Sequence, residues 1–266
     1  MKMIDGHVHI EKSPYTIDYI MEYVKQAQAR GVNEINLLEH THRFTEWKPL
    51  YEPARAAHPK MREWLDNKNT ISIQDYFKLI EEVKAMELPV KINFGLEVCY
   101  FKDKEDFIKE QLSLFPYDFV IGSIHYVYDV AYDLDNISQE ILWDVKDIDD
   151  IYRTYYKDTE NLIYSGLFTQ LAHMDTIKKY NLYPSYDLTN TYHHIAKLLK
   201  QLNMKTECNV GCYYRYHHHD LGLGDDLLKI LKEHHVEIVP CSDAHQPSDV
   251  GIYFDEVQKR LNNERP

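Results

Sequence analysis

The segment Asp5-Gly6-His7-Val8-His9-Ile10 forms the first apolar run of the chain. Residues i and i+2 of a β-strand point to the same face, so His7 and His9 are expected to point the same way. Two imidazoles on one face fit a pair of metal ligands. They also fit two polar residues on the solvated side of an edge strand. The remainder of the chain decides between these interpretations.

The composition is that of an acidic globular protein. Of the 266 residues, 44% are apolar and 27% are charged, which is typical of a chain with a sizeable core. The net charge is −13 and Lys and Arg form no long block, which argues against a protein that binds a nucleic-acid backbone. The length fits one large α/β domain as readily as two smaller ones.

The four cysteines are scattered along the chain, at positions 99, 208, 212 and 241, and form no CxxC pair. No apolar signal segment follows Met1, and no apolar run is long enough to span a bilayer. We therefore expect a reduced, cytoplasmic chain that does not associate with a membrane.

Short β-rich runs alternate with amphipathic helical stretches over the whole chain. After the first run, strands are predicted at 32–40, 90–100, 119–128, 168–175, 204–211 and 236–245. A helix is predicted from Thr16 to Gly31 and another from Ser72 to before Pro89, with others around 103–114, 148–165, 189–203 and 225–234. Repeated βα units predict a parallel sheet with helices outside, and seven units without a glycine-rich dinucleotide fingerprint favour a barrel.

The stretch 41–69 is long and contains prolines at positions 49, 53 and 59. Its pattern predicts a large irregular loop after the second strand. Such a loop often covers a functional site, but it is equally consistent with a simple insertion.

Potential ligands lie at the carboxyl end of nearly every predicted strand: His7, His9, Glu39, His40, His42, Glu97, His125, His173, Asp175, Asn209, Asp243 and His245. In parallel barrels the active site lies at that face. A single buried histidine is usually a core residue, but so many strand ends with an imidazole or carboxylate predict a multinuclear metal site.

The donor types indicate which metals the site would hold. Nitrogen-rich ligation with a few carboxylates suits Zn²⁺, Mn²⁺ or Fe²⁺ better than Ca²⁺ or Mg²⁺. Two or three divalent ions among mostly neutral imidazoles would make the pocket positive, which suits a phosphoryl group. A carboxylate such as Glu97 can bridge two ions, and a bridging water would be a hydroxide near neutral pH.

Six short motifs carry a resemblance to a known family. They are DGHVHI (5–10), EHTH (39–42), GLEV (95–98), GSIHYV (122–127), AHMD (172–175) and CSDAH (241–245). In this order they resemble the polymerase and histidinol phosphatase (PHP) family of metal-dependent phosphoesterases. The resemblance covers the whole chain, and implies one domain over residues 1–266. The implied fold is an α/β, distorted seven-stranded (β/α) barrel with a trinuclear metal site and no organic cofactor.

The resemblance also implies which residues hold the ions. One ion would be held by His7, His9, Glu97 and Asp243; a second by Glu97, His125 and His173; a third by His40 and His245. In many relatives a further histidine after the HxH pair completes the third site. Here that segment is EKSPYT, with Tyr15 and no histidine. Either His42 substitutes for it, which we favour, or the third site is weaker or partly filled.

Two motifs resemble the histidinol-phosphatase branch of the family, GSIHYV and AHMDTIKKY. They imply hydrolysis of L-histidinol phosphate, with Lys178 or Lys179 in contact with phosphate or, alternatively, as a solvated pair on a helix. Arg215, after the sixth strand, matches a phosphate-binding arginine. The threonine expected after Asn209 is absent, which puts the substrate loop in doubt.

The expected mechanism is attack of a metal-bridging hydroxide on phosphorus, without a phosphoenzyme. Asp243 or His245 would carry the proton to the leaving alkoxide, and Asp175 would orient a ligand histidine or cap a helix. A phosphoesterase for nucleotides or phosphotyrosine shares the same ligands and is the alternative. An exonuclease is disfavoured by the acidic charge, and a non-catalytic metal-binding protein by the presence of both carboxylates.

Overall fold

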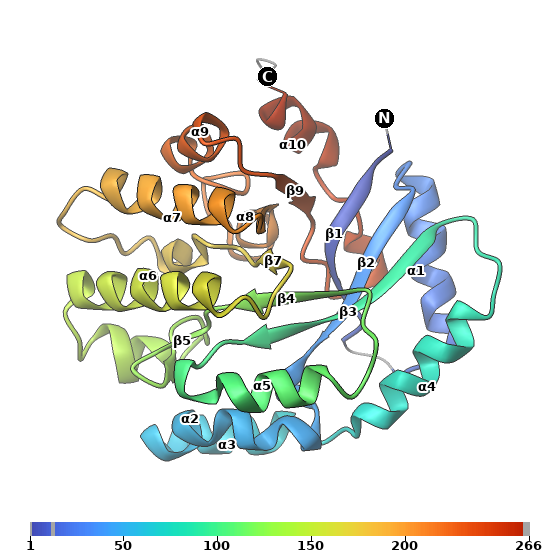
Figure 1. Ribbon diagram of the computed structural model, residues 1–266, viewed down its shortest axis with the longest axis horizontal. Coiled ribbons are helices and arrows are strands. Elements are labelled where there is room, and N and C mark those ends of the chain that lie inside the picture. Colours follow the sequence, from blue (N-terminus) through green and yellow to red (C-terminus); the bar gives the residue numbers. More distant parts are fainter. Residues whose placement is uncertain (1, 12–13, 263–266) are drawn as a thin grey trace.

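The structure is a computed structural model that describes residues 2–11 and 14–262. Seven parallel strands form one sheet that curls into a nearly closed barrel (Figure 1), in the order β1-β2-β3-β4-β7-β8-β9. The strands are β1 (Ile4–His9), β2 (Glu34–His40), β3 (Lys91–Cys99), β4 (Phe119–Ser123), β7 (Gln170–Leu171), β8 (Lys205–Asn209) and β9 (Ile238–Cys241). The predicted α/β barrel is thereby confirmed.

The first strand meets the segment that follows the last one. The His9 amide donates to the Ala244 carbonyl at 2.7 Å, and the Asp243 amide donates to the His7 carbonyl at 2.9 Å. These bonds bring the DGHVHI and CSDAH segments together, although more than 230 residues separate them in the chain. The barrel closes at its carboxyl end through these two segments.

Helices cover the outside of the barrel (Figure 1). They are α1 (Ile17–Ala29), α2 (Glu52–Ala57), α3 (Pro59–Lys68), α4 (Ile73–Lys84), α5 (Glu105–Leu112), α6 (Ile148–Ser165), α7 (Thr189–Gln201), α8 (Gly211–Tyr216), α9 (Asp225–Glu233) and α10 (Phe254–Leu261). Within the described ranges, none of these helices combines the length and apolar character needed to cross a membrane.

The helix boundaries follow local capping chemistry. The hydroxyl of Thr16 accepts a hydrogen bond from the Tyr19 amide, and that of Ser72 accepts one from the Gln74 amide. Each hydroxyl satisfies an amide that the first helical turn leaves without a partner. Gly31, just beyond α1, has a φ of +71°, a conformation that glycine adopts without steric cost. These signals explain why both helices lie where the sequence predicts them.

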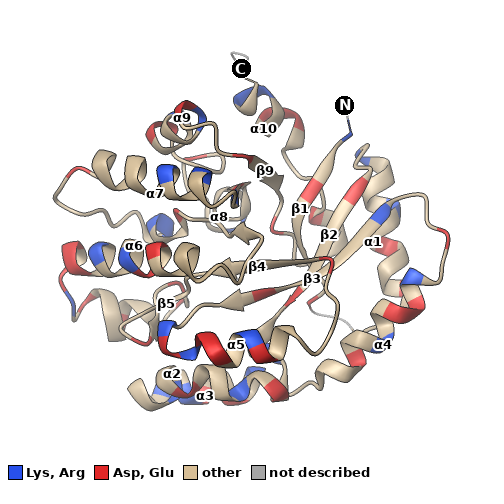
Figure 2. Cartoon of the chain, in the orientation of Figure 1, with Lys and Arg blue, Asp and Glu red and all other residues tan. Residues whose placement is uncertain are grey.

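The barrel interior is layered from its amino to its carboxyl end. At the amino end, Lys91 and Asn93 donate to Glu34 at 2.9 and 2.6 Å; Figure 2 shows acidic and basic residues side by side where β2 and β3 begin. A thin apolar layer of Leu38, Ile121 and Ala172 lies above. The next inward positions of β2 and β3 are His40 and Glu97, which are paired in register. Strand alternation therefore places these two ligand-type side chains at the carboxyl end.

Three predicted strands, β4, β7 and β9, are much shorter than the sequence pattern indicates. β4 ends at Ser123, and the chain then forms a separate hairpin of β5 (Tyr126–Val127) and β6 (Val130–Ala131). β7 pairs with its neighbours at only two positions. His125 and His173 therefore lie two residues beyond the ends of β4 and β7. Their side chains both reach Glu97 at the mouth of the barrel.

The prediction of an irregular loop over 41–69 is wrong. Short 3-10 helices cover Thr41–Arg43 and Thr45–Tyr51, and α2 and α3 follow. Pro49 lies within the 3-10 helix Thr45–Tyr51, and the other two of the three prolines lie in the first turns of α-helices, Pro53 in α2 and Pro59 in α3. Proline lacks only an amide that has no helical partner at such a position, so it starts a helix there instead of breaking one.

Candidate active site

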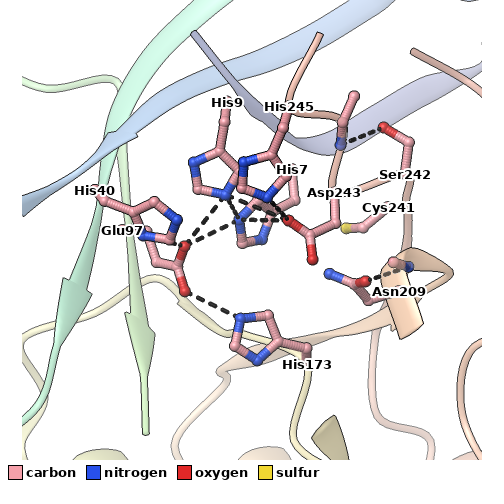
Figure 3. Close-up of polar contacts among 12 residues, drawn as sticks. His7, His9, His40, Glu97, His173, Asn209, Cys241, Ser242, Asp243 and His245 are labelled. Carbon is pink, nitrogen blue, oxygen red and sulfur yellow. Dashed lines mark hydrogen bonds and ion pairs between the residues drawn. The ribbon is translucent and has the colours of Figure 1, made fainter. Parts of the chain in front are cut away.

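A cavity of about 350 Å³ opens at the carboxyl ends of the strands. Its lining includes six of the predicted metal ligands: His40, Glu97, His125, His173, Asp243 and His245. The other two, His7 and His9, are fully buried and contact Glu97 from β1 (Figure 3). The structure thus brings all eight predicted ligand residues together, from segments spread over the whole chain.

Glu97 lies at the centre of these histidines, and its two oxygens face different groups. Oε1 is 2.8 Å from His125 Nε2 and 3.0 Å from His173 Nε2. Oε2 is 3.3 Å from the Nε2 atoms of both His7 and His9 and 3.1 Å from His40 Nδ1. A carboxylate that presents one oxygen to each of two imidazole groups is suited to bridge two ions.

Asp243 approaches the same histidines from the opposite wall. Its Oδ1 is 3.3 Å from His9 Nε2 and 3.4 Å from His245 Nε2, and its Oδ2 accepts a hydrogen bond from Arg215 at 2.6 Å. Its φ of +54° is unusual for a residue other than glycine, and such backbone conformations concentrate at functional sites. A Cβ on Gly211 would lie 2.5 Å from Asp243 Oδ2 and 2.6 Å from the Arg215 guanidinium, so glycine is needed there.

The donor set fits divalent metal ions. Nitrogen and oxygen atoms of three overlapping groups lie within 4.8 Å of one another: His9 with His40 and His245, His7 with His9 and Asp243, and His40 with Glu97 and His125. Within the described part of the chain, Glu97 Oε2, His9 Nδ1 and His40 Nδ1 are buried without a hydrogen-bond partner. Buried polar atoms rarely lack a partner, and a bound cation would satisfy those that point into the cluster.

Electrostatics favour the metal-binding forms of His9 and Glu97. Burial lowers the pKa of His9 to about 3, assisted by the neighbouring His40 and His245, so its imidazole is neutral. Burial alone would raise the pKa of Glu97, but His40, His7 and the hydrogen bonds from His125 and His173 hold it well below its usual range. Neutral imidazoles and an ionised carboxylate are the forms that bind metal.

Two carboxylates orient ligand histidines from behind, the buried Glu207 and the half-buried Asp133, and neither is among the site residues predicted from the sequence. Glu207 on β8 is 2.8 Å from His7 Nδ1 and accepts from the His173 amide at 3.0 Å. Asp133, after the hairpin, is 2.8 Å from His125 Nδ1. Contacts of this kind fix the ring orientation and tautomer of a metal-ligating histidine. Glu207 shares a strand face with Asn209, which was an available signal; Asp133 had none.

A third missed carboxylate, Glu11, faces the cavity directly. Its Oε2 is 3.1 Å from His245 Nδ1, and its Oε1 is 3.6 Å from His40 Nε2. Tyr15, in contrast, donates its hydroxyl to Glu39 at 2.9 Å. Glu39 was considered among the strand-end ligands, but it is fully buried on the opposite face of β2 from His40.

His42 lies at the rim of the cavity. Its ring stacks on His40 with 4.6 Å between centroids and lies 5.0 Å from the ring of Trp64 on α3. The helical segment after β2 therefore contributes to the cavity wall through His42, Trp64 and Lys68. It forms one side of the site, as the covering-loop interpretation expected, although it does so with helices.

The structure argues against Lys178 as a phosphate contact. Its ammonium is buried and donates to Asp175 at 2.6 Å, Asp220 at 2.9 Å and the Gly222 carbonyl at 2.9 Å. Lys179, the other candidate, does line the cavity, where it donates to Asp135 and lies 3.8 Å from the centroid of the Tyr216 ring. In the short 3-10 helix that carries both lysines, consecutive residues point in different directions.

Asp175 and Asn209 also differ from expectation. Asp175 orients no ligand histidine by hydrogen bond in the described chain and caps no helix; it accepts from Lys178 and from the Gly224 amide. Asn209 donates to Glu207 and accepts from the Gly211 amide, so it supports the site from behind. Asn209 was a possible ligand because it ends a strand, but its side chain hydrogen-bonds Glu207 on the same strand, while the Asp175 side chain is bound by Lys178 and the Gly224 amide.

Comparison with known proteins agrees with this geometry. The PHP domain family model matches residues 5–210. The chain is 25% identical to a Deinococcus radiodurans protein named "Probable histidinol-phosphatase" (98% of this chain and 93% of the relative). It is also 25% identical to the histidinol-phosphatase of Bacillus subtilis (98% and 100%).

A solved structure has the same fold. It is the histidinol phosphate phosphatase of Lactococcus lactis, complexed with zinc, L-histidinol and phosphate. The TM-score is 0.71 at 19% identity, over 98% of this chain and 93% of that one. With the family model spanning most of the chain and the barrel confirmed, this chain belongs to the PHP domain family.

Proposed function

We propose that this chain is a metal-dependent phosphomonoesterase that hydrolyses L-histidinol phosphate to L-histidinol and phosphate. The observation that carries the reaction class is Glu97, whose two oxygens face separate groups of histidines at the floor of one cavity. The names of the relatives from Deinococcus radiodurans and Bacillus subtilis, which this chain matches over nearly its full length, support the substrate.

The residues that would hold the ions follow from the donor atoms. His7, His9, Glu97 and Asp243 form one group, and Glu97, His125 and His173 form a second. His40 and His245 flank His9, with ring centroids 4.1 and 4.3 Å from its own, and would contribute to a third. Bound there, the ions would polarise a water for attack on phosphorus and neutralise the phosphoryl oxygens.

Arg215 is placed to bind and orient the phosphate. One guanidinium nitrogen is held by Asp243, while the Nε atom is buried without a hydrogen-bond partner among the described residues. An arginine that is fixed at one end and has a free donor at the other can receive a phosphoryl oxygen without reorganising. Lys179, at the same wall, adds a second positive charge.

Asp243 and His245 are our candidates to carry the proton to the leaving alkoxide. The bond from phosphorus to the ester oxygen breaks as a bond to the attacking water oxygen forms, so the alkoxide needs one proton. His245 Nε2 is 3.4 Å from Asp243 Oδ1, and both side chains line the cavity. His42 and Trp64 at the rim would contact the alcohol portion of the substrate.

The reaction in solution tests this proposal. Release of inorganic phosphate is measured for L-histidinol phosphate, a nucleoside monophosphate and phosphotyrosine, with Zn²⁺ or Mn²⁺ and with or without chelator. We expect metal-dependent release, with kcat/KM at least about 10-fold higher for L-histidinol phosphate, because a shaped pocket adds a few kcal/mol of discrimination.

The outcomes separate the two parts of the proposal. Equal turnover of the nucleotide or phosphotyrosine contradicts the substrate assignment and leaves the phosphatase class intact. Activity that survives in the Asp243→Asn variant contradicts the mechanism. No release from any of the three esters by the metal-loaded chain contradicts the phosphatase class. A cytoplasmic location stays a prediction; the four cysteines, all free and buried, are compatible with it.

A further inference from the structure

The segment after β1 departs from the family pattern at Tyr15, and the structure shows where its side chains go. Tyr15 packs against Tyr76, with 5.6 Å between ring centroids, and hydrogen-bonds Glu39 on the outer face of β2. It does not line the cavity. The position at which many relatives place a histidine is therefore turned away from the site in this chain.

Glu11 enters the cavity from the same segment. Its backbone carbonyl accepts a hydrogen bond from the Tyr19 hydroxyl at 3.3 Å, which anchors the turn, and its side chain is only 11% exposed. Among the described residues, its ionic contacts are with imidazoles alone: His245 Nδ1 at 3.1 Å and His40 Nε2 at 3.6 Å. A nearly buried carboxylate that faces only imidazoles is costly unless a cation joins them.

The nitrogen atoms that face Glu11 are distinct from those that face the inner carboxylates. His40 turns Nδ1 toward Glu97 and Nε2 toward Glu11. His245 turns Nε2 toward Asp243 and Nδ1 toward Glu11. The two rings thus present one nitrogen each to the inner ligand cluster and one each to Glu11. The Glu11 carboxylate therefore faces the nitrogen of each ring that points away from Glu97 and Asp243.

His42, the substitute that the sequence suggested, is placed differently. Its ring stacks face to face on His40 and against Trp64, so its contacts with the cluster are through the ring face rather than through a nitrogen. Like Glu11, it belongs to none of the groups of three converging ligand atoms among the described residues, so what distinguishes Glu11 is its carboxylate contacts with the nitrogens of His245 and His40. Stacking supports the His40 ring but offers no lone pair in that direction.

We propose that Glu11 completes the third metal site, together with His40 and His245. This inference rests on the proposed function, since it assumes that the cavity holds metal. Two imidazoles and one carboxylate are a sufficient ligand set for Zn²⁺ or Mn²⁺ and leave a position open for a phosphoryl oxygen. A carboxylate in place of a third imidazole also removes one positive charge from the loaded site.

Metal content tests the assignment independently of activity. Wild type, Glu11→Gln, His42→Asn and Tyr15→Phe are loaded in a buffer of fixed free Zn²⁺, passed through gel filtration and analysed by inductively coupled plasma mass spectrometry. We expect three equivalents per chain for wild type, His42→Asn and Tyr15→Phe, and two for Glu11→Gln. Tyr15→Phe is the matched control, because it changes a partly buried side chain of the same segment that points away from the cavity.

A measurement on the unmodified chain guards against a variant that fails to fold. Anomalous diffraction at the zinc edge from loaded wild-type crystals should show an ion in contact with the Glu11 carboxylate. The inference is overturned by an ion that contacts His42 instead, by only two ions in wild type, or by three equivalents in Glu11→Gln. If wild type binds three ions as proposed but releases no phosphate from any ester, the proposed function fails while the Glu11 assignment stands.

Discussion

The two ends of the barrel are both lined by charged side chains, but only one end satisfies its own charges. At the amino end, Glu34 accepts from Lys2 at 2.5 Å, Lys91 at 2.9 Å and Asn93 at 2.6 Å. At the carboxyl end, Glu97 and Asp243 face six histidines, and Arg215 is the permanent cation that pairs with Asp243 in the described chain. Acidic oxygens therefore have lysine partners at one end and mainly imidazole partners at the other.

This difference separates a structural charge cluster from a binding site. The amino-end groups cancel one another, and the lysines that pair with the buried Glu34 are more than half exposed, so each pair contributes little and needs no ligand. The carboxyl-end groups are buried, and Glu97 Oε2 has no hydrogen-bond partner among the residues that the structure describes. A buried cluster with unsatisfied oxygens becomes stable when a cation binds to it. Removing the cation, or a residue that supports its ligands, should therefore have measurable effects.

Removal of metal should have the largest effect. We expect chelation to lower phosphatase activity by at least about 1000-fold, since the ions would supply both the nucleophile and charge neutralisation. At a free metal concentration 100 times the dissociation constant, the free energy of unfolding should be about 3 kcal/mol higher for the loaded chain than for the metal-free chain. Phosphate release and urea denaturation, each with and without chelator, measure the two effects.

The amino end provides the control for metal removal. Lys205, paired with Glu237 at 2.6 Å, lies at that end, and a Lys205→Ala variant should lose activity and stability on chelation to the same extent as wild type. Activity that persists in chelator, and returns no further when Zn²⁺ or Mn²⁺ is added, would contradict a metal-dependent mechanism.

Arg215→Ala should have the next largest effect. Loss of a preorganised donor to a developing anion typically lowers the rate by about 100- to 1000-fold, and we expect kcat/KM for the phosphate ester to fall in that range. The substitution also leaves Asp243 Oδ2 without its present partner. Arg153→Ala, which removes an arginine from the exposed face of α6, is the matched control and should leave kcat/KM unchanged. A loss below 3-fold for Arg215→Ala would exclude a direct phosphate contact.

Glu207→Gln should weaken metal binding without removing a ligand. The carboxylate orients His7 and holds the His173 backbone, and substitutions of such orienting groups typically lower metal affinity about 10- to 100-fold. Competition with a chromophoric chelator measures the affinity. Glu237→Gln, a change of the same type at the amino end, is expected to leave the affinity within 2-fold of wild type. Equal affinities for both variants would show that Glu207 has no orienting effect on the metal ligands.

The site residues whose positions follow from the order of the parallel strands were predictable from the sequence. Parallel strands bring their carboxyl ends to one edge, so ligand-type residues at those ends must converge, whatever the helices between them do. His7, His9, His40, Glu97 and Asp243 follow from that rule. It needs only the positions of the strands, which apolar patterning reveals well.

The parts that depend on a partner distant in sequence were not predictable. Glu207 shares a strand face with Asn209, but its orienting role depends on His7, which lies 200 residues away in the chain. Lys178 looked like a phosphate ligand because its acidic partner Asp220 lies 42 residues away. Glu11 is not recognisable from the sequence, because the turn that carries it into the cavity is set by contacts with Tyr19 and His245.

Glu34→Gln should have the smallest effect and should depend on pH. Burial by itself raises the pKa of Glu34, but hydrogen bonds from Lys2, Asn93 and Lys91 outweigh it and lower the pKa to about 2. The folded chain thus binds the proton more weakly than the unfolded chain, so the contribution of Glu34 to stability is present above about pH 4.5 and is lost as the pH falls toward 2. Because the cluster lies close to solvent, we expect at most about 1 kcal/mol at pH 7.

Urea denaturation of the metal-free chain at pH 7 and pH 3 measures this difference without interference from acid release of metal. Wild type should be more stable than Glu34→Gln at pH 7, and the gap should narrow at pH 3, whereas phosphate release by the loaded variant should match wild type. A gap that is the same at both pH values would mean that Glu34 acts through its shape and not its charge. A loss of activity in Glu34→Gln would contradict the separation of a structural end from a functional end. The amino end would then be coupled to the site across the apolar layer of Leu38, Ile121 and Ala172.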